Sequence, residues 1–127
     1  MAADKVIFDR RTFFTGQRVL SQGDMGHTMY FVERGKVLIS LGDESRPVLL
    51  GEINAGGIFG EMALIDGAPR MAHATAAEES VLHAIPQSVF QQKMQASDPF
   101  IRALVRIMLN NLRAANTKAF AAEQRAA

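Results

Sequence analysis

The chain has 127 residues and a mass of 13.9 kDa, the length of a domain with one hydrophobic core. Hydrophobic residues make up 48% and charged residues 21%, a balance that excludes a disordered chain. The formal net charge of +1 is too small to indicate bulk attraction to nucleic acid or to a membrane. We therefore expect a single globular domain over residues 1–127.

The absence of cysteine excludes disulfides and thiolate metal sites. The N-terminal residues contain only a short apolar run, Val6–Phe8, which is too short for a signal peptide. No uncharged apolar stretch approaches the length that spans a membrane. We expect a cytoplasmic protein with no membrane partner.

Residues 10–85 alternate short apolar runs with glycine-rich turns. The runs, rich in β-branched and aromatic residues, predict strands at Val19–Leu20, Met29–Val32, Val37–Ile39, Val48–Leu50 and Val81–Leu82. Glu33–Lys36 lies between two of these runs and predicts a hairpin turn. Many short strands are typical of an antiparallel β jelly-roll barrel, so we expect a mainly β fold with flanking helices.

Residues 87–125 form the predicted helical part. A first helix is predicted over Gln87–Gln95, after Pro86, because Val89, Phe90 and Met94 have helical spacing. Ser97–Pro99 then combines an N-cap with a proline at the first helical position. Neither glycine nor proline follows, so one helix is expected to run to about Arg125. Its length of roughly 40 Å exceeds what covering a small barrel needs.

The long helix has two apolar stripes. One has the 4-3-4-3-4 spacing of a heptad seam, at Ile101, Val105, Met108, Leu112, Ala115 and Ala119. The other comprises Phe100, Leu104 and Ile107. One stripe can cover the barrel while the other meets a partner, and the alternative is that both pack on the barrel. We expect a symmetric homodimer through Ile101, Val105, Met108 and Leu112.

The segment Ile58–Ala72 carries the functional signal. Gly60 allows close backbone approach to a ligand, and a helical turn at Glu61–Leu64 would direct backbone N–H groups at an anion. Gly67–Pro69 returns the chain and brings Arg70 towards that turn. A guanidinium together with such amides makes a phosphate clamp.

Glu61 cannot bind phosphate, because both are anionic, but it can accept a hydrogen bond from a sugar hydroxyl. A carboxylate beside a guanidinium thus describes a ligand with a ribose end and a phosphate end. The alternative for Arg70 is an exposed loop arginine, and for Glu61 a carboxylate that the helix dipole favours.

The same residues resemble the phosphate-binding cassette of the cyclic-nucleotide-binding domain family, found in cAMP-dependent kinase regulatory subunits, catabolite activators and cyclic-nucleotide-gated channels. The resemblance lies in Phe59-Gly60-Glu61-Met62-Ala63-Leu64 and Pro69-Arg70-Met71-Ala72. It implies that Glu61 binds the ribose 2′-hydroxyl and Arg70 the exocyclic phosphate oxygens. The backbone of Gly60, Met62 and Ala63 would line the phosphate.

The family often has serine, threonine or alanine after the arginine, and a threonine there favours cGMP. Met71, followed by Ala72, has no hydroxyl, so cAMP is the expected ligand and cGMP the alternative. By the same resemblance the C-terminal helix would cover the base. Asn116 and Thr117 lie near the base-contacting positions of the catabolite activators, and Arg113 could stack on the base instead. An exposed polar helix face is the alternative for these three residues.

Other function classes are disfavoured or left open. An enzyme is not expected, because His27, His73 and His83 are scattered without a metal-binding spacing and no nucleophile motif occurs. Direct DNA binding is not expected, because the sequence ends within the long helix and has no room for a recognition helix. The open alternatives are a degenerate barrel that serves as a protein scaffold, and the sensing part of a transcription regulator.

Without an effector domain on this sequence, we expect a stand-alone sensor that acts on an unknown effector protein. The expected mechanism is a ligand-dependent movement of the long helix. The phosphate would draw the cassette inward, shift Leu64 and Ile65, and close the helix over the base.

Overall fold

The computed structural model describes residues 9–43, 45–64 and 69–126 of the chain. Its strands are β1 (Asp9–Phe13), β2 (Arg18–Leu20), β3 (Thr28–Arg34), β4 (Lys36–Leu41), β5 (Val48–Asn54), β6 (Ile58–Phe59), β7 (His73–Ala76) and β8 (Ser80–Pro86). The helical elements are the 3₁₀ turn η2 (Glu61–Leu64), α1 (Gln87–Gln95) and α2 (Pro99–Ala126).

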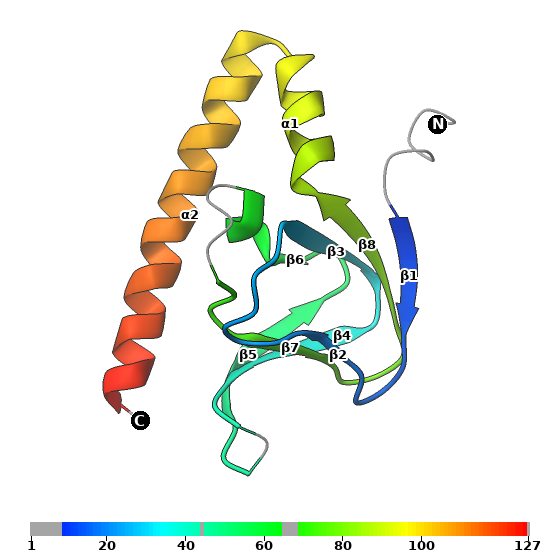
Figure 1. Ribbon diagram of the computed structural model, residues 1–127, viewed down its shortest axis with the longest axis vertical. Coiled ribbons are helices and arrows are strands. Elements are labelled where there is room, and N and C mark those ends of the chain that lie inside the picture. Colours follow the sequence, from blue (N-terminus) through cyan, green and yellow to red (C-terminus); the bar gives the residue numbers. More distant parts are fainter. Residues whose placement is uncertain (1–8, 44, 65–68, 127) are drawn as a thin grey trace.

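The strands form two antiparallel four-stranded sheets, in the orders β1-β8-β3-β6 and β2-β7-β4-β5. The two sheets face each other, and the helices lie outside them (Figure 1). The expected mainly β jelly roll with flanking helices is therefore confirmed. The two sheets share no ladder pairing among the described residues, so they form a sandwich-like roll rather than a closed barrel.

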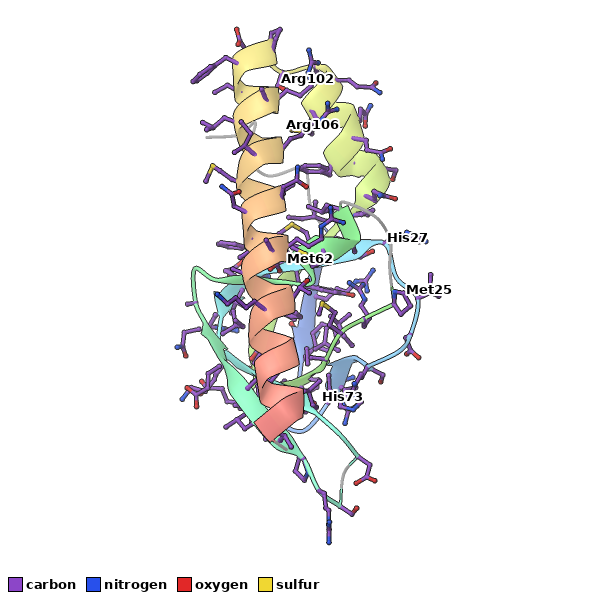
Figure 2. The ribbon with its side chains drawn as sticks, turned by 90° about the vertical axis from the view of Figure 1, so that its left-hand side faces the viewer. Met25, His27, Met62, His73, Arg102 and Arg106 are labelled. Carbon is purple, nitrogen blue, oxygen red and sulfur yellow. The ribbon has the colours of Figure 1, made fainter. Side chains whose placement is uncertain are left out.

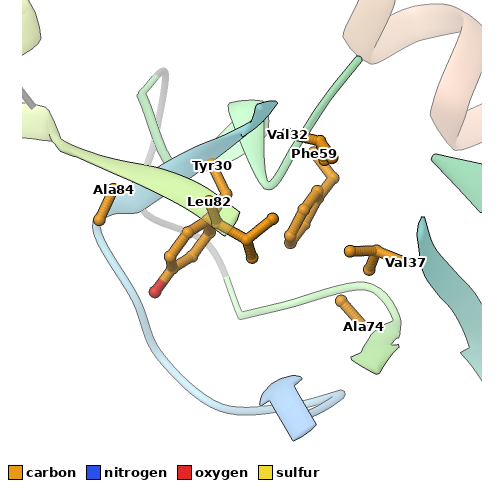
Figure 3. Close-up of a cluster of buried hydrophobic side chains, with 7 residues drawn as sticks. All are labelled: Tyr30, Val32, Val37, Phe59, Ala74, Leu82 and Ala84. Atoms are coloured by element: carbon orange, nitrogen blue, oxygen red, sulfur yellow. The ribbon is translucent and has the colours of Figure 1, made fainter. Parts of the chain in front are cut away.

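The hydrophobic core lies between the sheets and draws on both of them. Its buried members are Tyr30, Val32, Val37, Phe59, Ala74, Leu82 and Ala84 (Figure 3). The rings of Tyr30 and Phe59 stack, with centroids 5.3 Å apart and an interplanar angle of 16°. This stack joins β3 to β6, the strand that leads directly into η2, so the core fixes the start of the predicted cassette.

The predicted hairpin at Glu33–Lys36 is wrong. β3 pairs with β6 and β8 while β4 pairs with β5 and β7, so these residues carry the chain from one sheet to the other. The crossing bends at Gly35, which has a φ of 106°, a left-handed conformation that glycine adopts at low cost. A Cβ at Gly35 would lie 2.6 Å from the Cα of Ser80, so the tight approach of β8 also requires glycine.

The helical part agrees with its sequence signals. α1 covers the predicted residues, and α2 begins at Pro99 with the Phe100 N–H donating to Asp98 Oδ1 at 2.8 Å, an N-cap bond. The guanidinium of Arg102 donates to the carbonyl oxygens of Met94 and Gln95 at 3.3 and 3.4 Å. These bonds satisfy carbonyls at the end of α1 that have no partner inside the helix and tie the two helices at their junction.

α2 passes along the η2 side of the β roll (Figure 1) and contacts η2. The predicted heptad seam lies at the border of its covered face: Val105 and Leu112 are partly buried, whereas Ile101 and Met108 are exposed. The exposed large apolar side chains described on α2 form one strip, 41–69% exposed, made of Phe100, Ile101, Leu104, Ile107 and Met108. We call these five residues the α2 strip. No helix within the described residues is both long and apolar enough to cross a membrane.

Candidate functional site

A cavity of about 210 Å³ opens between the second sheet and the cassette. Its walls are mainly apolar. They are formed by Leu20, Ile39, Ile53, Ile58, Phe59, Gly60, Glu61, Met62, Ala63, Pro69, Arg70, Met71, Ala72, His73 and Ala74. The structure thus brings together seven of the predicted site residues: Gly60, Glu61, Met62, Ala63, Arg70, Met71 and Ala72.

Arg70 is held at both its backbone and its guanidinium. Its N–H donates to the Asp24 carbonyl at 2.8 Å, and its carbonyl accepts from the Gly23 N–H at 2.9 Å. The guanidinium Nη2 donates to the carbonyl oxygen of Thr28 at 2.8 Å, and Nη1 to that of Gly60 at 3.4 Å. The side chain therefore spans from β3 to the start of the cassette.

Among the described residues, the guanidinium of Arg70 is hydrogen-bonded to carbonyl oxygens. Burial lowers the pKa of the guanidinium from its ordinary value, because desolvation disfavours the charged form. The group nevertheless stays protonated near neutral pH. No carboxylate among the described residues forms an ion pair with it. A partly buried cation that lines a cavity without such a partner favours an anionic ligand.

Glu61 is a carboxylate in the wall of the cavity. It begins η2, lines the cavity and is only 8% exposed. The preceding residue, Gly60, has a φ of 74°. A Cβ there would lie 3.1 Å from Arg70 Nη1 and 3.3 Å from the Thr28 carbonyl oxygen. Glycine thus lets the chain turn sharply from β6 into η2 beside the guanidinium.

The backbone of η2 is partly satisfied internally. The Ala63 N–H donates to the Gly60 carbonyl oxygen at 3.1 Å. The same oxygen also accepts the hydrogen bond from Arg70 Nη1. Of the three backbone groups expected to line a phosphate, that of Ala63 therefore already has a partner within the turn. Met62 lies on the side of η2 along which α2 passes (Figure 2).

His73 is a cavity residue that the sequence reasoning assigned no role at the site. It lies on β7, and its Nδ1 accepts from the Gln22 N–H at 2.9 Å and from Arg18 at 2.6 Å. Because Nδ1 accepts a backbone N–H, the ring proton is on Nε2, which donates to the Gly42 carbonyl at 2.7 Å. His73 thus ties two loops to β7. A lone histidine in an alternating strand gives no signal for such contacts.

Two of the predicted base-contacting residues, Arg113 and Thr117, do not line this cavity. Arg113 on α2 is partly buried and engaged in an interaction, whereas Thr117 is exposed. The side chain of Asn116 lies outside the described residues. Within the described part of the chain, no group of three or more histidine, cysteine, aspartate or glutamate residues could hold a metal ion.

Comparison with known proteins places these features in a family. The family model of the cyclic nucleotide-binding domain matches residues 10–97, which include both sheets except Asp9, and the whole cassette. The chain belongs to the cyclic nucleotide-binding domain family. This family is defined by ligand binding rather than by catalysis, and its match covers Glu61 and Arg70.

Two curated relatives share 38% identity with the chain. The cyclic AMP receptor protein of Thermus thermophilus matches 81 residues, 61% of this chain and 37% of that protein. A cyclic nucleotide-gated potassium channel of Rhizobium etli matches 91 residues, 72% of this chain and 24% of the channel. The matches thus span well under half the length of either relative.

A solved structure of the EAL enzyme Bd1971, in its half-site-occupied form, has a similar fold. It superposes with a TM-score of 0.76 at 32% identity and covers 86% of this chain and 98% of that one. Further structures of the same enzyme are a cAMP-bound and a cGMP-bound form, with TM-scores of 0.67 and 0.69. The binding domain is therefore found both in regulators and joined to an enzyme.

Proposed function

We propose that this chain is a sensor that binds a cyclic nucleotide, with cAMP as its preferred ligand, in the cavity beside the cassette. Arg70 holds the cyclic phosphate, and Glu61 accepts a hydrogen bond from the ribose 2′-hydroxyl. The single observation that supports this most is the Arg70 guanidinium. It is charged, lines the cavity, and is balanced there by carbonyl oxygens without an ion pair to a described carboxylate.

The walls of the cavity suit a purine and a sugar. Besides Glu61, Arg70 and His73, the described lining residues are apolar, as is typical of small-molecule sites that have a few placed polar groups. Met71 stands beside Arg70 and offers a polarizable thioether to the base. It has no hydroxyl to donate to guanine, which favours cAMP over cGMP. The backbone of Gly60 and Met62 would approach the phosphate, and Ala72 would close the wall behind it.

The proposed output is a movement of α2. The helix contacts η2, so a phosphate that draws the cassette inward changes the surface on which α2 rests. None of the described side chains of α2 lines the cavity, so contact of Arg113 or Thr117 with the base requires α2 to close. A ligand that binds the closed arrangement more tightly shifts the population towards it.

We further propose that two copies associate through the α2 strip. Five large apolar side chains lie exposed on one face of this helix, and contiguous exposed apolar surface marks interaction sites. A twofold axis beside α2 would cover the same strip on both copies. Movement of α2 would then reach the partner copy or an effector protein directly.

Isothermal titration calorimetry with cAMP, and with cGMP as competitor, tests the ligand. The Arg70→Ala variant removes the cation, and losing a charge-assisted contact in a buried site is expected to cost about 2–5 kcal/mol of binding free energy. The matched control is Arg34→Ala, since Arg34 is exposed at the end of β3 and does not line the cavity. Saturable cAMP binding that only Arg70→Ala abolishes supports the proposal. Folded wild-type protein that binds neither nucleotide would contradict it.

A further inference from the structure

The loop between β2 and β3, residues 21–27, forms the support on which Arg70 rests. Gly23 and Asp24 of this loop exchange two backbone hydrogen bonds with Arg70, at 2.9 and 2.8 Å. The carbonyl oxygen of Thr28, the first residue of β3, accepts a hydrogen bond from the guanidinium Nη2 at 2.8 Å. Between these two anchors lies Gly26, flanked by Met25 and His27, which Figure 2 labels at the edge of the molecule. The loop and β3 thus hold Arg70 at both ends.

Gly26 leaves the space that the guanidinium occupies. A Cβ built on Gly26 would lie 2.5 Å from Nη2, 2.6 Å from Nε and 2.7 Å from Cζ of Arg70. Contacts under 3.0 Å are essentially never made by a real Cβ. Any side chain at this position therefore displaces the guanidinium or the loop.

Space alone, and not backbone conformation, requires glycine here. Gly26 is absent from the glycines with positive φ, in contrast to Gly23 in the same loop. An alanine at Gly26 is therefore free of left-handed strain. The atoms that it would meet are the far end of a flexible side chain, so the guanidinium is the group that yields.

We propose that Gly26 is a positioning residue for Arg70. Its missing side chain lets the guanidinium lie against the β2–β3 loop, donate to the Thr28 carbonyl and face the cavity from a fixed direction. A side chain at Gly26 moves the guanidinium off Thr28 and out of register with a bound phosphate, while the two backbone hydrogen bonds of Arg70 keep the loop in place. The part of this proposal that concerns phosphate rests on the proposed function.

The binding test compares Gly26→Ala with Gly51→Ala. Gly51 is a matched control, because it lies on β5 outside the cavity lining, has no positive φ and has open space where a Cβ would stand. Gly26→Ala is expected to weaken cAMP binding by about tenfold to a hundredfold, the range for a disturbed hydrogen bond to a charged group. Gly51→Ala is expected to bind as wild type does. Wild-type affinity in Gly26→Ala would overturn the proposal.

A double-mutant cycle in ligand-free protein tests whether Gly26 acts through Arg70. Gly26→Ala is expected to lower the melting temperature in the wild-type background, and to lose this effect in the Arg70→Ala background, where no guanidinium stands in the way. The effect of alanine on the unfolded chain is the same in both backgrounds and cancels. Equal shifts in the two backgrounds, zero included, would overturn the proposal. Because the cycle needs no ligand, it decides the role of Gly26 even if wild-type protein binds no cyclic nucleotide and the proposed function fails.

Discussion

The interior between the two sheets and the outer face of α2 both contain large apolar side chains, but the described residues bury those between the sheets and leave those on α2 exposed. Leu82 has no exposed surface, whereas Phe100 on the α2 strip is 69% exposed. Burial of apolar surface is what stabilises a fold. The side chains between the sheets therefore stabilise this chain itself, while those of the α2 strip contribute when another surface covers them.

The largest expected effect separates these two regions by stability. Leu82→Ala leaves a cavity in the core and is expected to lower the free energy of unfolding by about 2–5 kcal/mol. Phe100→Ala removes a larger side chain from an exposed position and is expected to change it by about 0.5 kcal/mol or less. Urea unfolding at a dilution where the protein is monomeric measures both, because association would add to the apparent stability. A loss for Phe100→Ala as large as that for Leu82→Ala would mean that the chain covers this face in solution.

The next effect concerns association. Ile107→Glu places a charge within the α2 strip, where Ile107 is exposed, and is expected to shift a wild-type dimer to monomer. Burying an unpaired carboxylate in an apolar interface costs several kcal/mol. Sedimentation velocity over a range of concentrations measures the shift.

Asn110→Glu is the matched control for this experiment. Asn110 is exposed on α2 and lies roughly 120° around the helix from the centre of the α2 strip, so the same charge should leave the dimer intact. Wild-type protein that stays monomeric at high concentration would contradict the proposed homodimer. Dissociation by both variants would place the interface elsewhere on α2.

The smallest effect lies on the outer surface of the first sheet, away from both regions. Hydrogen bonds from Arg10 and then His83 lower the pKa of Glu33 to about 2. A carboxylate whose pKa is depressed in the folded state adds stability above its unfolded pKa and loses it as the pH falls through the folded value. The contribution of Glu33 to the free energy of unfolding is thus complete above a pH of about 4.5 and is lost towards a pH of about 2. Lowering the pH through this range should reduce the urea midpoint of Glu33→Gln slightly less than that of the wild type. The difference is small because the ion pair of Glu33 and Arg10 is exposed. Identical slopes in both proteins would contradict this.

The sequence predicted those elements whose signal is local. α1, the start of α2 and the strands at Met29–Val32 and Val37–Ile39 follow from periodicity and capping residues. β7 was missed because its buried residues, Ala74 and Ala76, are small and have low strand propensity. The wrong hairpin at Glu33–Lys36 has another cause. Two apolar runs around a glycine turn look the same whether the strands pair or pass to opposite sheets.

The site divides in the same way. Glu61 and Arg70 could be predicted to meet because they lie in one short motif, and both line the cavity. The contact of Gly26 with Arg70 could not be predicted, because the two residues are distant in the sequence. The backbone of Gly26 also has no positive φ that would mark it. The exposed side of α2 could not be assigned either. Its two stripes are neighbours on the helix, and the packing of α2 against η2 and α1 divides the first of them, so that Val105 and Leu112 are partly buried while Ile101 and Met108 stay exposed.

The most direct test of the central claim is a crystal structure of the chain grown with cAMP. We predict that the nucleotide lies in the cavity, with a phosphate oxygen within about 3 Å of the Arg70 guanidinium and the ribose 2′-hydroxyl donating to Glu61. A nucleotide bound elsewhere, or one whose phosphate is held without Arg70, would contradict it.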